Sequence, residues 1–331
     1  MKHLSILALD DQYNLSTIAC MAGTHEVFSE ANTYWSRSGK APRFKIEFVA
    51  ATKRRRRDDA LFSLRSNASI ADIGHTDLIV IPSSLVRSYD MASKNNRKLI
   101  DWVRERHEHG AELASMCTGI FLLASTGLLE GKTCSTHWAV SDNFRALFPG
   151  VDLQTDKLIT DEAGIYTNGG AYSFLHLLLY LVEKHYDRMT AIHCAKVFQI
   201  DMDRDQQAGF AIFNGHKRHD DDLVLKAQAY IEKHYEDRLS MEDVSARFNI
   251  GRRSFDRRFI RATGLTPLDY LQRVKVEAAK KNFEVTGRNV NEVMYAVGYT
   301  DAKAFRDVFS RITGMAPIEY RSKYNRERAQ N

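Results

Sequence analysis

One cysteine stands where the sequence can support nucleophilic chemistry. Cys117 follows the apolar run Glu112 to Met116 and precedes Gly119 and a helical pattern from Ile120 to Thr126. A nucleophile at a sharp strand-to-helix turn is exposed above the sheet, and the helix N-terminus favours its thiolate. The same spacing also fits an inert cysteine at the end of a buried strand. The residues alone leave both interpretations open.

The C-terminal third of the chain contains a repeat. Phe255 to Tyr270 returns fifty residues later as Phe305 to Tyr320, and seven of the sixteen aligned positions are identical. The identical pairs are Phe255/Phe305, Phe259/Phe309, Arg261/Arg311, Thr263/Thr313, Gly264/Gly314, Pro267/Pro317 and Tyr270/Tyr320. Two Phe residues four apart mark the buried stripe of a helix, Thr-Gly ends that helix, and Pro can begin the next. The sequence therefore predicts two copies of one helical unit.

Each copy is expected to contain two short helices joined by a turn. Ser240 with Asp243, and Asn289 with Glu292, give matching helix starts ahead of the repeat. The predicted helices are 241–248 and 252–262 in the first copy and 291–297 and 302–312 in the second, with an amphipathic connector at 267–284. Such a rigid connector would hold two DNA-reading helices about 34 Å apart, which is one turn of B-DNA.

This order of motifs continues over about the last 110 residues of the chain. It includes Ser240 to Gly264, the connector, Val297 to Asp301 and Thr313 to Arg321. The ordered set resembles the AraC/XylS family of bacterial transcription regulators, and the alternative is an unrelated helical bundle with accidental internal similarity. The resemblance implies an all-α domain with two helix-turn-helix units that binds double-stranded DNA. The contact residues that it implies are Arg252, Arg253, Asp256, Arg257, Lys303 and Arg306.

Charge is distributed unevenly along the chain. Residues 223–331 hold 21 Lys and Arg against 14 Asp and Glu, a balance of +7, whereas residues 1–222 hold 26 against 28, a balance of −2. A basic surplus in the repeated half suits contact with phosphate. The basic run Lys53 to Arg57 is followed at once by Asp58-Asp59 and lies outside the repeat, so we interpret it as a solvated loop rather than a nucleic-acid patch.

Length and composition limit the remaining possibilities. With 331 residues the chain can form two domains, each with a sizeable core. Its cysteines, Cys20, Cys117, Cys134 and Cys194, form no CxxC pair and no metal-like spacing with histidine, so neither a metal, a cofactor nor a disulfide framework is expected. The longest apolar run, near Leu177 to Val182, is far too short to span a membrane. We expect a cytoplasmic protein in a reducing compartment, with no membrane partner.

The first 200 residues alternate apolar runs with helical patterns, which predicts an α/β domain with a mostly parallel sheet covered on both faces. The expected strands are Leu4–Leu9, Phe44–Ala50, Leu78–Pro82 and Glu112–Met116, with edge strands at Leu158–Thr160 and Ile165–Thr167, and the expected helices are 16–32, 94–108, 119–127 and 172–186. The acid-rich segment 201–222 is interpreted as a linker. The predicted domains, 1–200 and 223–331, lie on either side of it.

Several motifs surround Cys117. They are Cys117-Thr118-Gly119, Leu122-Leu123-Ala124, Gly127 to Gly131 and Thr136-His137-Trp138. Residues 1 to about 200 resemble the ThiJ/PfpI-like, glutamine-amidotransferase-like domain, and the order of the two domains resembles the GlxA-like branch of AraC-type regulators. The resemblance implies a flavodoxin-like fold and a pocket that includes Cys20, Cys117, Thr118 and His137, where a small-molecule effector would bind. We also expect a homodimer.

Three departures from the family's pattern argue against catalysis. Thr118 stands where hydrolytic members have a histidine directly after the nucleophile, and Cys20 stands where they have an acid. Without a base or an orienting carboxylate, the proton transfers that contribute ~10²-fold to 10⁴-fold have no agent. Ser83-Ser84 replaces a Gly-Gly pair that would bring backbone N–H groups close to the thiol. We interpret His137 as a packed structural residue.

The chain is therefore interpreted as a DNA-binding transcription regulator, not an enzyme, with a degenerate sensing domain. The rival hypothesis is a Cys117-dependent amidase-like or glyoxalase-like hydrolase that retained a DNA-binding tail, and a third is an interaction scaffold without DNA sequence preference. Cys20 in place of the acid also suggests a reversible disulfide with Cys117. The simpler interpretation is that Cys20 fills space on the inner face of its helix.

Overall fold

The computed structural model describes residues 1–9, 14–52, 66–84, 94–204 and 206–325 of the chain. The chain divides into two units, Met1–Gln207 and Ala208–Asn331. The predicted linker 201–222 is thus divided between the units, and the domain boundaries inferred from the sequence stay a prediction. The basic run Lys53 to Arg57 lies outside the described residues.

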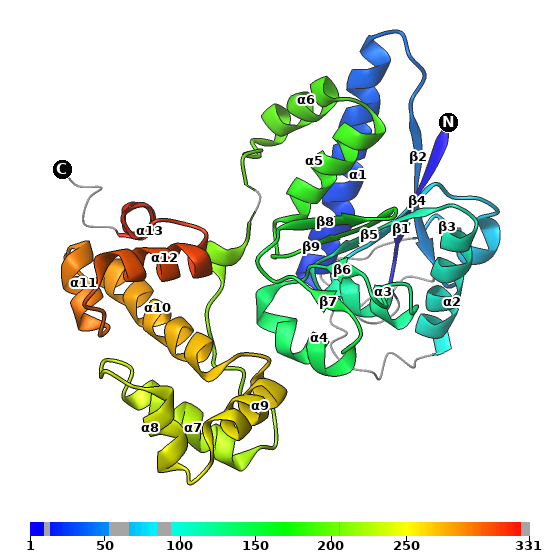
Figure 1. The fold of residues 1–331 in the computed structure, drawn as a ribbon. Helices are drawn as coiled ribbons and strands as arrows, with labels where there is room; N and C mark the ends of the chain where they lie inside the picture. Colours follow the sequence, from blue (N-terminus) through cyan, green and yellow to red (C-terminus); the bar gives the residue numbers. More distant parts are fainter. Residues whose placement is uncertain (10–13, 53–65, 85–93, 205, 326–331) are drawn as a thin grey trace. The chain divides into compact units, whose positions relative to one another are not determined.

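A parallel sheet forms the centre of the first unit (Figure 1). Within the described residues its seven strands have the order β3-β2-β1-β4-β5-β9-β8, and only β8 and β9 pair antiparallel. The strands are β1 (Lys2–Leu7), β2 (Phe44–Ala50), β3 (Ala68–Ser69), β4 (Leu78–Ile81), β5 (Glu112–Met116), β8 (Ile159–Glu162) and β9 (Ile165–Asn168), and β6 (Thr133–Cys134) pairs separately with β7 (Asp152–Leu153). The mostly parallel sheet is confirmed. The strand expected at an edge near Ile165 is instead interior, because β9 pairs with β5 on one side and β8 on the other.

Helices cover both faces of this sheet, because successive strand residues point to opposite sides. In β4, Leu78 and Val80 pack against one set of helices, while Ile79 and Ile81 pack against the other. The first set is α1 (Leu15–Arg37), α5 (Phe174–His185) and α6 (Arg188–Phe198), and the second is α2 (Lys94–Glu108), α3 (Ile120–Ser125) and α4 (Ser141–Leu147). The sequence predicted α1, α2, α3 and α5 but did not predict α4 or α6.

In the described part of the second unit, all the regular secondary structure is helical. Its helices are α7 (Asp222–Lys233), α8 (Met241–Arg247), α9 (Arg252–Thr263), α10 (Pro267–Val285), α11 (Val290–Ala296), α12 (Ala302–Thr313) and α13 (Pro317–Tyr324). Ser240 and Asn289 cap α8 and α11 with their side chains, as predicted. Gly264 and Gly314 end α9 and α12 in the left-handed conformation. The two predicted helix-turn-helix units are therefore α8 with α9 and α11 with α12.

Helix α10 belongs to two cores. Its first half, with Tyr270, packs with α7, α8 and α9, whereas its second half, with Phe283, packs with α11, α12 and α13. The two halves end in matching hydrogen bonds. Tyr270 donates to Glu232 of α7 at 2.6 Å, and Tyr320 of α13 donates to Glu284 of α10 at 2.5 Å. Thus α10 closes the first copy of the repeat and opens the second.

Candidate ligand pocket and nucleic-acid interface

Cys117 lies at a sharp turn between β5 and α3, in the short 3₁₀ helix η2 (Cys117–Gly119). Its φ of 52° is in the left-handed region, which a residue with a side chain seldom adopts and which is enriched at functional sites. Gly119 permits the turn, since a Cβ there would lie 2.5 Å from the Pro82 carbonyl oxygen. The tight elbow predicted around Cys117 is present.

Thr118, which stands in place of the family's histidine, ties the ends of two strands together. Its Oγ1 accepts a hydrogen bond from the Ser84 backbone N–H at 2.9 Å and donates one to the Ser84 carbonyl oxygen at 2.6 Å. The Ser83 hydroxyl lies 2.9 Å from the same Thr118 oxygen. The Ser84 N–H is a donor that an oxyanion site at this turn would need, and it is already used.

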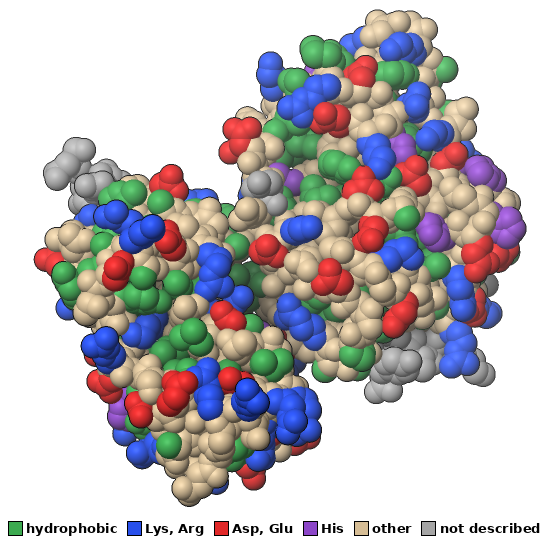
Figure 2. All heavy atoms as spheres, viewed as in Figure 1, with side chains coloured by type: hydrophobic (Ala, Val, Ile, Leu, Met, Phe, Trp, Pro, Cys, Tyr) green, Lys and Arg blue, Asp and Glu red, His purple; other side chains and the backbone are tan. Residues whose placement is uncertain are grey.

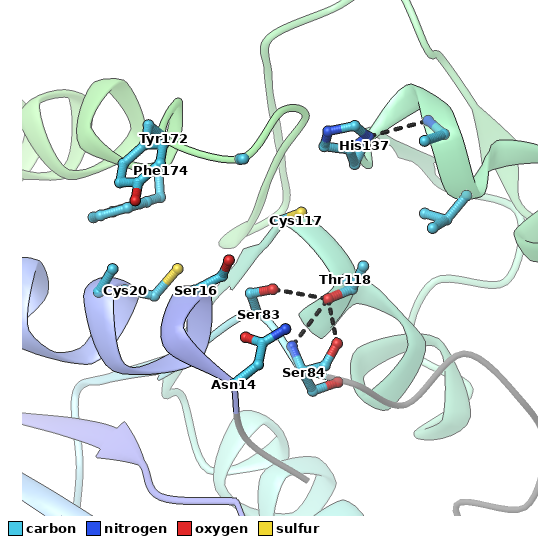
Figure 3. Close-up of a pocket in the computed structure, with 14 residues that line it drawn as sticks. Asn14, Ser16, Cys20, Ser83, Ser84, Cys117, Thr118, His137, Tyr172 and Phe174 are labelled. Carbon is cyan, nitrogen blue, oxygen red and sulfur yellow. Dashed lines mark hydrogen bonds between the residues drawn. The ribbon is translucent and has the colours of Figure 1, made fainter. Parts of the chain in front are cut away.

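A cavity of about 220 Å³ opens beside the elbow (Figure 3). All four residues predicted for a ligand pocket, Cys20, Cys117, Thr118 and His137, line it. Lining residues that the sequence analysis did not assign include Asn14, Ser16, Tyr172 and Phe174. Asn14 could have been found from the sequence, because asparagine is a favoured N-cap residue and it stands just before the predicted helix at 16–32. No comparable signal marks Tyr172 and Phe174, which are far from Cys117 along the chain.

Neither of the two cysteines at this cavity is in a disulfide, and both are buried. Burial raises the pKa of the Cys20 thiol to about 12, with a smaller contribution from the neighbouring Cys117. Cys20 is therefore a neutral thiol at physiological pH. The position at which hydrolytic relatives are expected to hold a carboxylate is consequently uncharged.

Two further polar groups face the cavity. The His137 Nδ1 accepts a hydrogen bond from the Ala139 backbone N–H at 3.1 Å, so a neutral ring carries its proton on Nε2. The Ser84 side chain is 2% exposed, and its Oγ has no hydrogen-bond partner in the part of the chain that the structure describes. Because an unpaired buried hydroxyl is unfavourable, a rotation of Ser84 that exposes this Oγ to the cavity would let a ligand atom bond to it and stabilise the site.

The cavity has little of the chemistry needed for acid–base catalysis or metal binding. Among the described residues that line it there is no Asp, Glu, Lys or Arg. The described ranges also contain no group of three His, Cys, Asp or Glu side chains that could hold a metal ion. What the arrangement offers is hydrogen bonds from neutral groups and contact with two aromatic rings.

Helix α9 presents the groove-facing residues predicted for the first helix-turn-helix unit. Its Phe255 and Phe259 are buried, whereas Arg253 and Arg257 are exposed. Arg252 donates to both carboxylate oxygens of Asp256, at 2.9 and 3.0 Å, and to Glu242 at 2.7 Å. The remaining two arginines make no hydrogen bond or ion pair with any residue that the structure describes. Lys and Arg side chains gather over α9 in Figure 2.

Helix α12 has the same division in the second unit. Phe305 and Phe309 are buried, and Lys303, Arg306 and Asp307 are exposed. The structure thus puts all six residues predicted to contact DNA on α9 and α12, but Arg252 and Asp256 are already paired with each other. Their contacts with DNA stay a prediction.

Two family models match this chain. Residues 26–184 match the DJ-1/PfpI family, and residues 244–323 match a helix-turn-helix domain. The first match contains the Cys117 elbow, and the second contains both α9 and α12. No helix in the described residues is both long and apolar enough to cross a membrane.

Similar proteins include transcriptional regulators. The HTH-type transcriptional regulator GbdR of Pseudomonas aeruginosa is 22% identical over 68% of this chain and 61% of its own length. The regulator CdhR of the same species is 21% identical over 78% of this chain and 76% of its own length. A solved structure, a putative transcriptional regulator from Vibrio parahaemolyticus, has a TM-score of 0.50 and 23% identity, and covers 59% of this chain and 98% of its own. The chain thus spans less than two thirds of GbdR, and the structural likeness establishes the fold of the part of this chain that it covers.

Proposed function

Because this chain belongs to the AraC-family regulators that carry a DJ-1/PfpI domain, we propose that it binds specific DNA sequences and regulates transcription in response to a small molecule. The observation that carries the proposal is the duplicated scaffold. Two helix-turn-helix units share α10, and each presents unpaired basic side chains on the outer side of its second helix. Double-stranded DNA and a second copy of the chain are the proposed macromolecular partners.

The Cys117 cavity supports the sensing part of the proposal. A volume of about 220 Å³ lies below the roughly 300–1,000 Å³ of drug-sized ligand sites and suits only a ligand of few atoms, and the Ser84 hydroxyl and the His137 ring are polar groups at the cavity that could bond to it. The absence of a charged side chain from the described lining favours binding over turnover.

The test of the DNA-binding proposal is selection from random duplexes by the full chain. We expect recovery of one motif whose two parts lie about one turn of DNA apart, as two linked recognition helices require. Equal binding of the recovered motif and of bulk DNA would contradict the proposal and favour an interaction scaffold.

A hydrolase remains the second candidate, because the strained left-handed backbone at Cys117 is a feature of nucleophile elbows, although the Cys117 side chain itself is buried. The test measures hydrolysis of amide and thioester substrates by the full chain and by its Cys117→Ala variant. We expect equal background rates for both. Turnover by the unmodified chain that Cys117→Ala abolishes would establish the hydrolase instead.

A further inference from the structure

Gln207, the last residue of the first unit, is anchored behind the Cys117 cavity. Its side chain is fully buried, and its Nε2 donates to the Thr136 carbonyl oxygen at 2.8 Å. Its backbone N–H donates to the Asp156 carbonyl oxygen at 2.9 Å. A Cβ on Gly169 would lie 1.8 Å from the Gln207 Nε2, so the glycine makes room for the amide.

The Thr136 segment, which bonds to the Gln207 side chain, and the Gly169 segment, which packs against it, both lead into walls of the cavity. Thr136 donates its hydroxyl hydrogen to the Cys117 carbonyl oxygen at 2.9 Å and is followed by His137, which lines the cavity. Gly169 leads in the same way to Ala171 and Tyr172, which line it as well. Thr136 is therefore joined by one hydrogen bond to Cys117 and by another to Gln207.

The Gln207 side-chain amide does not form all of its possible hydrogen bonds. The Gln207 Oε1 is buried and has no hydrogen-bond partner in the described part of the chain. A buried amide oxygen without a partner loses the hydrogen bond that water would supply. The anchored arrangement and a released one are thus closer in free energy than they would be with a fully bonded amide.

Residues 208–221, which follow Gln207 directly, form a strap across the second unit. The strap starts at the second helix-turn-helix unit, where the 3₁₀ helix η4 (Ala208–Phe210) packs on α12 and α13. A Cβ on Gly209 would lie 2.5 Å from the Met315 Cε, and the Phe210 ring lies 6.4 Å from that of Tyr324.

The strap then follows α10 to the first helix-turn-helix unit. Lys280 of α10 donates to the Ala211 carbonyl oxygen at 2.5 Å, and Glu277 of α10 accepts from the Phe213 backbone N–H at 3.2 Å. At the far end, His216 contacts the Thr263 carbonyl oxygen at the end of α9 at 2.8 Å. One short segment therefore touches the C-terminal ends of both recognition helices, α12 and α9.

We propose that Gln207 and the strap couple the Cys117 cavity to the pair of helix-turn-helix units, so that release of Gln207 changes how α9 and α12 are held. The proposal rests on the proposed function as a DNA-binding regulator. It makes Gln207 a positioning residue, because its fully buried side chain lies outside the lining of the cavity. Coupling of two sites is reciprocal, so DNA binding would change the affinity of the cavity for its ligand, and we expect this change to be detectable in the walls of the cavity.

The test uses this reciprocity and needs no knowledge of the effector. Amide hydrogen exchange is measured in the full chain, with and without the duplex recovered by selection, in peptides that cover residues 134–140 and 168–174. We expect DNA to change exchange in both peptides by about 5-fold or more, the lower range of allosteric couplings. Gln207→Met keeps the size of the side chain but removes the donor, and we expect it to abolish this change while DNA binding persists.

Gln206, the exposed residue next to Gln207, gives a matched control. Gln206→Met makes the same substitution without removing the buried amide, and it should behave as the unmodified chain. On the strap, Lys280→Met should also abolish the change, and the exposed Lys281→Met should not. An unmodified chain that binds the duplex without a change in the two peptides would overturn the coupling. The same change in Gln207→Met and in Lys280→Met would overturn it too, whereas lack of any preferred duplex would remove the proposed function itself.

Discussion

Arg253 and Arg252 are adjacent in the sequence but differ in what their side chains can do. The Arg253 guanidinium is exposed and makes no bond with another described side chain, so it is available to a base edge. We expect Arg253→Ala to relax sequence preference at one or two positions at a cost of about 1–3 kcal/mol in binding free energy. The measurement is a binding titration against duplexes substituted at each position of the selected motif.

Arg252→Ala is the matched control. Because Arg252 is paired with Asp256 and Glu242, its removal should leave the motif unchanged. A uniform loss of affinity for all sequences in Arg253→Ala would instead identify Arg253 as a phosphate contact.

The two thiols at the cavity give a redox prediction. Two thiols and one hydrogen peroxide molecule form a disulfide and two water molecules, and the elbow thiol Cys117 would react first because burial keeps Cys20 protonated. We expect mass spectrometry of peroxide-treated protein to detect a Cys20–Cys117 bridge that is lost in Cys20→Ser. If Cys117 ends only as sulfenic or sulfinic acid while Cys20 stays unmodified, the paired-thiol hypothesis is wrong and Cys20 is a space-filling residue.

At the scale of the element, two glycines of the second unit separate backbone strain from crowding. Gly264 and Gly298 both have a φ of 73°, but a Cβ on Gly264 meets nothing within 4 Å, whereas one on Gly298 would lie 2.2 Å from the Glu236 carbonyl oxygen. We expect Gly264→Ala to lower the free energy of unfolding by about 1–2 kcal/mol. Gly298→Ala should lower it by a further 1–3 kcal/mol or so, since the approaching group is backbone.

Chemical denaturation followed by circular dichroism checks this difference between the two glycines. Equal losses in the two variants would show that the turn between α11 and α12 moves away from Glu236 without penalty.

Helix α12 supports a prediction about salt. Lys303 and Arg306 are exposed near Asp307, which disfavours close approach to phosphate at that point, so this helix should contact the DNA backbone more than bases. We expect Lys303→Ala or Arg306→Ala to reduce the slope of log affinity against log salt by about one. The slope is obtained from titrations at several salt concentrations, and an unchanged slope in both variants would contradict the assignment.

The elements that the sequence predicted best are those with local signals. Helices α8 to α12 begin and end within about a residue of their predicted bounds because caps and left-handed glycines act through adjacent residues. The Cys117 elbow was predictable for the same reason. Helix α6 was not predicted. The position of Gln207 could not be predicted either, since its side chain bonds to residues 50 to 72 positions away in the sequence and no local pattern marks it.

At the scale of the whole molecule, Glu112 of β5 makes the stability of the folded protein depend on pH. His185, whose Nε2 lies 3.4 Å away, and the Tyr166 hydroxyl, which donates at 2.6 Å, lower the pKa of Glu112 to about 2 against the effect of burial. A carboxyl whose pKa is lower in the folded state stabilises the protein above its unfolded pKa, and this stabilisation is lost as pH falls through the folded pKa.

We therefore expect the unfolding free energy to decrease between about pH 5 and pH 2, with Glu112 contributing on the order of 1–2 kcal/mol after discount for its partial exposure. Glu112→Gln should be less stable at pH 7 and should show a shallower decrease in acid. Denaturation curves at a series of pH values provide the measurement, and parallel decreases in the variant and the unmodified chain would exclude this role of Glu112.

The packing of α10 in two hydrophobic cores has a consequence for how this domain can evolve. The first half of α10 carries Pro267 and Tyr270, the counterparts of Pro317 and Tyr320 in α13, and its second half packs in the second copy as α7 packs in the first, so the two copies are fused within α10. Neither copy can be deleted, exchanged or reordered without exposing an apolar half of α10 to water. Relatives that recognise other operators should therefore have diverged by substitution on the outer sides of α9 and α12, and the inner faces of α10 should be the slowest part of the unit to change.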